Sequence, residues 1–563
     1  MGVCPSEQAA CVGPQNQRGR GDKTLKVDGD ALALPVPKSG GLRPLGSALL
    51  RGRLQGGFRR PAGFGLFEGA AGGGAQGLVR RRMGGEGFAH RPDLGCLAQL
   101  RQSQLSLAAA DRPADERRPA CDLSLPEGVG AGTSQTVNDD NDLGLPARAA
   151  ALDILTAALA RRTGLEEAIS TKAFGALSPR DRAFARALAM ATLRRLGPID
   201  RALDAKLAKA PPEGIRQILR IGVAQAFLLE TPPHAAVATS VDLAASRRDT
   251  APFKGLVNAV LRGLLREPPN LDDPEVLAPP WLMARWRAAY GPETALQIAQ
   301  VIAQEPATDL SVRDPATSQA LAAELEAEIL DGGSLRTARR GDLATWPGFE
   351  SGAWWVQDAS AAIPARLLEA GPDQQVLDLC AAPGGKTLQL AATGASVTAL
   401  DRSAGRLKRL AANLERMGLK AATVTANAVD WTAPDLFDAV LLDAPCSATG
   451  TFRRHPDVLW AARPADIASL AETQARLLDA TALRVAPQGR LIYCVCSLEP
   501  EEGESQVDGF LARHPNFVLE PIVAGEGGAP APSVRADGTL RILPFHSPGG
   551  ADGFYIARFL RQS

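Results

Sequence analysis

Short apolar runs alternate with helical segments in the last third of the chain, and this alternation limits the possible folds more than any other feature of the sequence. The runs lie at residues 376–379, 396–400, 422–425, 439–442 and 489–495. Apolar runs of this length, bounded by turn residues, are typical of buried parallel strands. Their alternation with helices predicts a doubly wound α/β sheet. Three further runs, at 517–520, 540–543 and 553–559, have no helix between them and predict an antiparallel edge.

The overall composition excludes some partners and compartments. The chain has 563 residues, enough for three or four domains, and carries 62 basic and 62 acidic residues. Because the formal charge is zero, any nucleic-acid binding must come from local basic clusters. No apolar stretch has membrane-spanning length, and the first thirty residues lack the apolar core of a signal peptide. We therefore expect a cytoplasmic protein that does not bind membranes.

The eight cysteines show neither a disulfide framework nor the paired spacing of a zinc site. Cys494 and Cys496 are separated by one residue, which is too close for half of a usual zinc knuckle. Reduced thiols are therefore expected, and no metal.

Four regions follow from changes in composition. Residues 1–143 are rich in Gly, Arg, Ala and Pro and lack apolar periodicity, so we predict a disordered extension. An RNA-binding arm, a targeting segment and a misassigned start remain alternatives for it. Residues 144–285 show helical spacing of apolar residues, for example at 215–229, 235–246 and 253–265, and predict an all-α domain. In that domain Ser178 precedes Pro179 as the expected N-cap of a helix.

The remaining two regions are a small module and the α/β part. Residues 286–372 predict a small α+β module. It should contain helices at 295–303 and 318–329, and strands at 309–313 and 334–337. Residues 373–563 predict the α/β domain that carries the chemistry.

A glycine-containing loop at residues 380–386 is the candidate cofactor site. It follows Asp378 at the end of the first apolar run, and Asp401 ends the next run. An acidic residue in that place holds ribose hydroxyls in nucleotide-binding sheets. The dinucleotide fingerprint is absent, and Cys380 stands where a phosphate loop would need its first glycine. A nucleoside cofactor without phosphates, S-adenosylmethionine, fits better.

Two cysteines follow neighbouring apolar runs. Cys446 closes the segment Asp-Ala-Pro-Cys that begins at Asp443, and Cys496 follows the run at 489–495. A single cysteine at a strand end is more often a small buried residue, but two of them beside an aspartate favour covalent chemistry. A thiolate that adds to carbon 6 of a pyrimidine makes carbon 5 reactive towards a methyl donor. An acid is then needed at ring nitrogen 3, and Lys386 or a helix N-terminus could lower the pKa of the nucleophile.

Residues from about 146 to the end resemble the Sun-type (RsmB/Fmu) RNA cytosine-5 methyltransferases of bacteria, which carry a NusB-like RNA-binding domain ahead of the catalytic part. The resemblance rests on five catalytic segments, at 380–386, 443–450, 453–457, 493–497 and 552–554, and on residues 253–262 of the helical region. It implies a multidomain protein with an S-adenosylmethionine-dependent methyltransferase domain. It also implies methylation of a cytidine in small-subunit (16S) ribosomal RNA.

The resemblance also implies roles for particular residues. Cys496 would be the nucleophile and Cys446 would assist product release, with Asp443 and Lys386 beside them. Cofactor contacts are expected from Cys380, Ala381, Ala382, Pro383, Gly384, Gly385, Lys386, Asp401, Arg406, Asn427 and Asp443. RNA contacts are expected from Arg453, Arg454, His455, Lys254 and Arg262, although the last two could belong to an ordinary solvated face.

One position departs from the family pattern. Asn427 stands where members usually have an acidic residue near the adenine, and Asp430 is expected to lie too far along to replace it. Asn keeps an acceptor and adds a donor, so cofactor binding should survive.

Three other functions stay open. A DNA cytosine-5 methyltransferase would use the Cys446 position and would lack a thiol at 496. A catalytically idle RNA-binding ribosome-assembly factor would need neither thiol. A tRNA cytidine could replace the rRNA cytidine as substrate. We expect a monomer.

Overall fold

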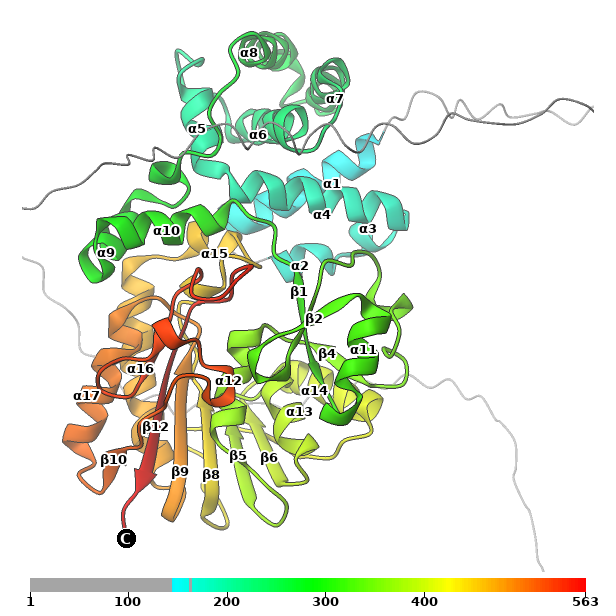
Figure 1. Ribbon diagram of the computed structural model, residues 1–563. Coiled ribbons are helices and arrows are strands. Elements are labelled where there is room, and N and C mark those ends of the chain that lie inside the picture. The colour runs from blue at the N-terminus through cyan, green and yellow to red at the C-terminus, as the bar shows by residue number, and fades with distance from the viewer. Residues whose placement is uncertain (1–143, 162–164) are drawn as a thin grey trace, which may run out of the picture. The chain divides into compact units, whose positions relative to one another are not determined.

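The computed structural model describes residues 144–161 and 165–563 (Figure 1). The disorder expected for residues 1–143 therefore lies outside the described residues. Among the described residues, no helix is both long and apolar enough to cross a membrane.

The first described region, residues 144–161 and 165–266, is helical, as predicted. Its helices are α1 (Leu145–Thr156), α2 (Leu165–Ile169), α3 (Lys172–Gly175), α4 (Pro179–Arg194), α5 (Leu196–Asp204), α6 (Glu213–Leu228), α7 (Pro233–Ala245) and α8 (Lys254–Arg266). Their apolar faces share one core that includes Leu155, Leu188 and Ile218. The predicted N-cap is confirmed, because the Ser178 hydroxyl accepts a hydrogen bond from the Asp181 amide at 3.1 Å.

The small module contains more sheet than the sequence predicted. Helices α9 (Pro280–Tyr290) and α10 (Pro292–Ile302) lead into β1 (Thr308–Val312), α11 (Ser318–Leu325), β2 (Ala327–Ile329), β3 (Leu335–Thr337) and β4 (Trp354–Val356). The four strands form an antiparallel sheet in the order β2-β3-β1-β4. The helix predicted at 318–329 is therefore too long. Glu326 adopts a left-handed φ of 51°, which ends α11 and starts β2. The expected boundary after residue 285 falls inside α9.

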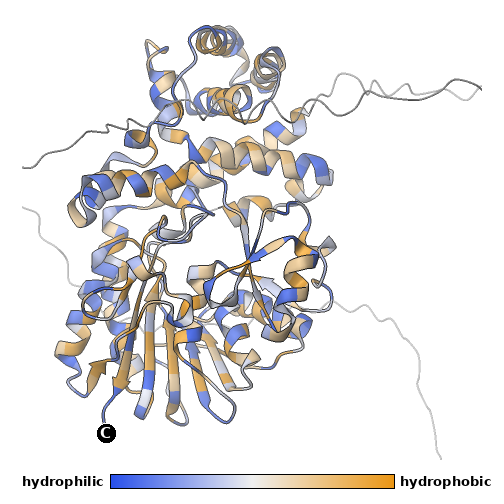
Figure 2. Ribbon diagram, viewed as in Figure 1, coloured by the Kyte–Doolittle hydropathy of each residue, from blue (hydrophilic) through white to orange (hydrophobic). Residues whose placement is uncertain are grey.

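The catalytic sheet confirms the predicted alternation. Its parallel strands are β5 (Gln375–Leu379), β6 (Ser396–Asp401), β7 (Ala422–Thr425), β8 (Phe437–Asp443) and β9 (Val485–Val495). Its antiparallel edge consists of β10 (Phe517–Leu519), β11 (Leu540–Ile542) and β12 (Phe554–Arg561). The order is β10-β12-β9-β8-β5-β6-β7, with β11 paired to β12. Figure 2 shows the apolar residues concentrated along these strands.

Helices cover both faces of the sheet (Figure 1). They are α12 (Ala359–Leu367), α13 (Gly385–Ala392), α14 (Ala404–Met417), α16 (Pro464–Ala482) and α17 (Glu504–Arg513), whereas α15 (Asp457–Ala461) packs beside α9 and α10. Leu478 of α16 and Phe510 of α17 pack on one face. Ile363 of α12 packs on the other face, where Leu388 of α13 and Leu410 of α14 form an adjoining cluster. Burial on both faces explains why the strands read as continuous apolar runs.

Candidate active site

The two candidate thiols lie at the carboxyl ends of neighbouring strands. Strands β8 and β9 pair in parallel and place Asp443 opposite Cys494. The loops that follow are joined by backbone hydrogen bonds from Ala444 N to Cys494 O and from Gly450 N to Cys496 O, both 3.0 Å. The sulfur atoms of Cys446 and Cys496 are consequently only 3.5 Å apart. The structure thus brings together two residues that are 50 positions apart in the sequence.

Gly450 is needed for this approach of the two loops. A Cβ atom at that position would lie 2.1 Å from the carbonyl oxygen of Gly553, and Gly553 N donates to Gly450 O at 2.8 Å. A side chain at residue 450 would therefore push the loop away from the segment that precedes β12.

Cys446 and Cys494 both have a raised pKa. The hydrogen bond to Cys496 and burial both raise the pKa of Cys446 well above its ordinary value. Burial likewise raises the pKa of Cys494, which lies in the strand with its side chain enclosed. Cys446 and Cys494 therefore remain thiols at neutral pH, and the Cys446 thiol can donate a hydrogen bond to a thiolate at Cys496.

An ion pair lies beside the thiols. Lys386 Nζ is 2.7 Å from Asp443 Oδ2, and the Cys494 thiol donates to Asp443 Oδ1 at 3.4 Å. Burial lowers the pKa of Lys386, but Asp443, Cys494 and Cys496 together raise it by more. Lys386 is therefore a fixed positive charge close to both sulfurs. The Asp443 side chain keeps 33% of its surface exposed, so it can reach a bound ring.

The loop between β5 and α13 is tied to the end of β6. Asp401 accepts hydrogen bonds from Ala382 N at 3.2 Å and from Ser403 N at 2.9 Å. Arg406 donates to the carbonyl oxygen of Ala382 and lies 3.6 Å from the Asp401 carboxylate. Cys380 takes a left-handed φ of 61°, and burial raises its pKa to about 12. Cys380 is therefore a structural thiol of the turn.

The donor and acceptor set of this loop suits a nucleoside cofactor without phosphates. Asp401 offers carboxylate oxygens at the place where ribose hydroxyls bind in such sheets. Lys386, the cation of the loop, is already bonded to Asp443 and is not free to bind a phosphate. Carboxylates at both sides of the loop also favour a positively charged sulfonium. The residues present thus fit S-adenosylmethionine.

Asn427 is bonded to its neighbour Asp430. The Asn427 amide donates to the Asp430 carboxylate and accepts a hydrogen bond from Val429 N at 3.2 Å. That Asp430 lies too far along to replace the usual acidic residue stays a prediction.

The Arg453 side chain is not accessible to an RNA phosphate. Its side chain is only 1% exposed, and its Nη2 lies 2.5 Å from Asp358 Oδ2. It belongs to a buried ion cluster that consists of Asp309, Arg336, Asp358, Arg453, Arg454 and Asp552. The prediction of an RNA contact at Arg453 is wrong, because the guanidinium is enclosed and bonded to carboxylates.

The other predicted RNA residues differ in exposure. Arg454 is bonded to Asp552 but keeps 33% of its side chain exposed. Burial, with a contribution from Arg454, lowers the pKa of His455 to about 4, so His455 is neutral at pH 7 and offers no charge to a phosphate. Lys254 and Arg262 are exposed on α8, where Arg262 donates to Asn258 Oδ1 at 3.0 Å. Their RNA contacts stay predictions.

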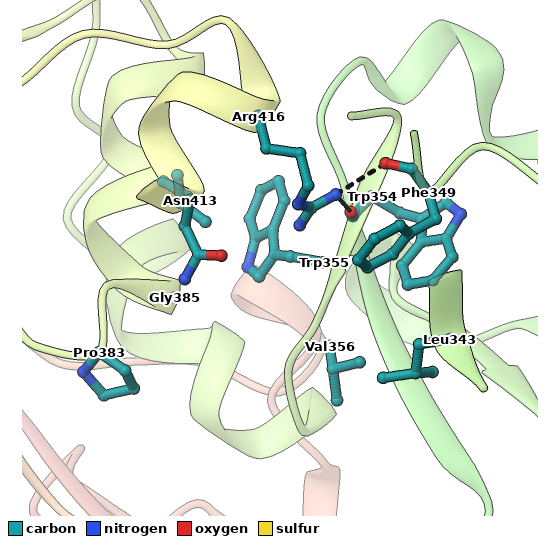
Figure 3. Close-up of a pocket in the computed structure, with 10 residues that line it drawn as sticks. Leu343, Phe349, Trp354, Trp355, Val356, Pro383, Gly385, Asn413 and Arg416 are labelled. Carbon is teal, nitrogen blue, oxygen red and sulfur yellow. Dashed lines mark hydrogen bonds between the residues drawn. The ribbon is translucent and has the colours of Figure 1, made fainter. Parts of the chain in front are cut away.

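A cavity of 230 Å³ lies on another side of the cofactor loop (Figure 3). Arg416 spans it and donates to the carbonyl oxygens of Phe349 and Trp354 at 2.9 and 3.3 Å. The residues that line it are Leu343, Phe349, Trp354, Trp355, Val356, Pro383, Gly385, Leu388, Asn413 and Arg416. Pro383 and Gly385 of the predicted cofactor loop line this cavity, whereas the candidate thiols and Asp401 do not. Trp354 and Trp355 are buried and belong to the core.

Sequence reasoning missed a polar group beneath the thiol loops. Glu502 ends the turn Pro500–Glu502, and its side chain is fully buried. It accepts hydrogen bonds from Ser447 and Ser497. The acidic run at 499–502 gave no local signal, since such a run normally lies on a solvated turn. Within residues 144–161 and 165–563, no group of three or more His, Cys, Asp or Glu side chains is placed to hold a metal.

The chain is similar to known RNA methyltransferases. Residues 365–560 match the family model "16S rRNA methyltransferase RsmB/F", and residues 145–266 match the NusB family. A ribosomal RNA small subunit methyltransferase B from Sodalis glossinidius is 36% identical over 69% of this chain and 91% of its own length. The protein of that name from Cronobacter sakazakii is 34% identical over 69% of this chain and 92% of its own. The crystal structure of PH0851 aligns with a TM-score of 0.60 and 26% identity, over 74% of this chain and 98% of that one.

Proposed function

Because the chain belongs to the RsmB/F family of 16S rRNA methyltransferases, we propose that it methylates carbon 5 of a cytidine in 16S rRNA and that Cys496 is the covalent nucleophile. The observation that carries this proposal is the 3.5 Å separation of the Cys446 and Cys496 sulfurs beside the Lys386–Asp443 ion pair. A catalytically idle RNA-binding factor would not require two adjacent thiols beside the positive charge of Lys386.

The first part of the reaction belongs to Cys496, Lys386 and Asp443. Cys496 adds as a thiolate to carbon 6, and the electrons of the carbon 5–carbon 6 double bond make carbon 5 nucleophilic. The positive charge of Lys386 lies close to the Cys496 sulfur and stabilises negative charge in the site. As the ring takes up a proton at nitrogen 3, the Asp443 carboxylate accepts a hydrogen bond from it and so stabilises the adduct. Bound S-adenosylmethionine supplies the methyl group, and the loop at 380–386 together with Asp401, Arg406, Asn427 and Asp443 would hold it.

The second part releases the product. Carbon 5 now carries both a methyl group and a proton. When a base removes the proton, the carbon 5–carbon 6 double bond forms again and the bond from carbon 6 to Cys496 breaks. Cys446 keeps its own proton, because its pKa is raised, and it can donate a hydrogen bond to the departing Cys496 sulfur. This hydrogen bond stabilises the thiolate as it leaves.

Single substitutions of the two thiols test the chemistry. The Cys496→Ala variant should lose methyl transfer and form no adduct. The Cys446→Ala variant should accumulate a covalent protein–RNA adduct, visible as a heat-stable shifted band on a denaturing gel, because release lacks its hydrogen-bond donor. Ser469→Ala, at an exposed position of helix α16, is the control and should retain methyl transfer. If Cys496→Ala still methylates RNA, the covalent mechanism is refuted.

The substrate is tested with RNAs of different classes. We propose 16S rRNA in the cytoplasm, bound by the protein as a monomer, with phosphate contacts from Arg454, Lys254 and Arg262. Incorporation of labelled methyl groups should be found with 16S rRNA and not with tRNA or DNA, and bisulfite sequencing should then locate the cytidine. Incorporation into tRNA alone would refute the substrate assignment and leave the chemistry intact.

A further inference from the structure

Glu502 lies between the two loops that carry the thiols. Cys446 is followed directly by Ser447, and Cys496 is followed directly by Ser497. Both serines are bonded to the Glu502 carboxylate. We propose that Glu502 is a positioning residue that holds the Cys446 and Cys496 sulfurs at the separation required for product release. This inference rests on the proposed function and deepens it.

The carboxylate accepts four hydrogen bonds. Oε1 accepts from Ser447 N at 2.9 Å and from Gln474 Nε2 at 3.1 Å. Oε2 accepts from Ser497 Oγ at 2.5 Å and from the Ser447 hydroxyl. The bonds come from three separate elements, namely the loop after β8, the loop after β9 and helix α16. One carboxylate therefore fixes these elements relative to each other.

The two oxygens of the carboxylate have different kinds of partner. Oε1 accepts from two N–H groups, whereas Oε2 accepts from two serine hydroxyls, which can also act as acceptors. A glutamine could therefore keep the two bonds at Oε1 and donate its NH2 group to the hydroxyls, whereas an alanine removes all four bonds. Loss of this acceptor would leave several buried donors without a partner. A buried polar network in which one carboxylate has four partners indicates that the relative position of the two thiol loops is important.

Glu502 is itself firmly held. Its backbone carbonyl accepts a hydrogen bond from the buried Tyr493 hydroxyl at 2.6 Å, and its amide donates to Glu499 O at 3.1 Å. Gln474 also donates to Pro445 O at 2.9 Å, one residue before Cys446. Hydrogen bonds through Glu502 and Gln474 therefore connect strand β9 to Pro445, the residue before Cys446.

The charge of Glu502 acts in the same direction as its geometry. The hydrogen bond to Cys496 and burial are the main causes that raise the pKa of Cys446, and the negative charge of Glu502 adds to them. Cys446 thus keeps the proton with which it stabilises the departing Cys496 sulfur.

The experiment compares Glu502→Ala, which removes all four hydrogen bonds, with Glu501→Ala in the full chain. Glu501 is the matched control, since it is the neighbouring carboxylate but is half-exposed and paired with Arg285. The first measurement is the rate at which diamide forms the Cys446–Cys496 disulfide, followed by peptide mapping. The two thiols lose two electrons and two protons, and diamide is reduced to its hydrazine. This rate reports the relative position of the sulfurs without RNA.

The second measurement is methyl transfer to 16S rRNA. Glu502→Ala should form the disulfide about tenfold more slowly, and its kcat should fall about 10- to 100-fold, as expected when reacting groups are displaced by about an ångström. Its affinity for S-adenosylmethionine should stay unchanged, and the steady-state fraction of covalent adduct should rise because release lags behind addition. Glu501→Ala should behave as the wild type in every measurement.

Several outcomes would overturn the inference. Wild-type rates of disulfide formation or of methyl transfer in Glu502→Ala would do so. So would a joint loss of melting temperature and cofactor affinity with no rise in adduct, which would indicate a purely structural role. If Glu502→Ala fails to fold, Ser447→Ala, which removes one of the hydroxyls bonded to Glu502, should show the same slower disulfide formation and raised adduct. If the wild type itself transfers no methyl group to RNA, the proposed function fails, while the disulfide rates still decide whether Glu502 positions the sulfurs.

Discussion

Substitution of Arg453 by Met should destabilise the protein rather than weaken RNA binding. Arg453 is 1% exposed and belongs to the buried ion cluster, where three guanidinium groups balance three carboxylates. Burial raises the pKa of Asp358, but Arg453 and Arg454 lower it by more, so Asp358 stays charged. The variant would leave one carboxylate unbalanced in the interior. Loss of one partner from a buried pair costs about 3–5 kcal/mol.

This free energy is large against the stability of a typical domain, about 5–15 kcal/mol. In a domain of about 150–250 residues, each kcal/mol of lost stability lowers the melting temperature by about 2–4 °C. A decrease of roughly 6–20 °C is therefore expected. Burial raises the pKa of Asp552 to about 6, and loss of Arg453 would raise it further. Because the unbalanced carboxylate can then be protonated in mild acid, the decrease should be smaller at pH 5.5 than at pH 8.

The assay is thermal unfolding of the full chain, followed by RNA affinity measured well below the transition. Arg463→Met is the matched control, since Arg463 is exposed and paired only with Asp466, and its loss should change stability by less than about 1 kcal/mol. A wild-type melting temperature for Arg453→Met together with weaker RNA binding would refute the structural role.

Two further predictions concern the cofactor loop. Burial raises the pKa of Asp378 to about 7, and Thr387 donates to its Oδ2. Since this folded-state pKa lies above the unfolded value of 3.8, the wild type should lose stability relative to Asp378→Asn as the pH rises from about 4 to 7, by up to roughly 4 kcal/mol. Equal urea midpoints of the two proteins at every pH would contradict this. Gly384 has a φ of 109°, and a Cβ there would lie 2.2 Å from Leu410 Cδ1, so Gly384→Ala should cost about 1–3 kcal/mol and weaken S-adenosylmethionine binding in calorimetry. Gly405→Ala in helix α14 is its control, because the nearest atom lies 4.0 Å away and the change should be neutral or stabilising.

The sheet and the thiols were predictable because their signals are local. Each strand of the catalytic sheet is an apolar run, since both faces are covered, and parallel strands end at one edge. The meeting of Cys446 and Cys496 follows from that rule alone, once both are seen to follow strands. The end of α11 had no such signal, because Glu326 takes a left-handed conformation that its residue type does not announce.

The roles of Arg453 and Glu502 were not predictable from the sequence. Arg453 lies in an Arg-Arg-His segment that is typical of an RNA contact, but its bonded partner Asp358 lies 95 residues away in the sequence. Glu502 meets Ser447 across 55 residues. For charged side chains, burial depends on partners that only the folded chain brings near. Charge and spacing alone therefore assign them to the surface.

The buried ion cluster joins parts of the chain that the family model divides. Asp309, Arg336 and Asp358 precede its start at residue 365, and Arg453, Arg454 and Asp552 follow it. Neither set is neutral, since the first has two acids and one base and the second has the reverse. An exchange of the small module between relatives would succeed only if the incoming piece brought the complementary charges with it. The small module and the methyltransferase sheet therefore form one electrostatic unit.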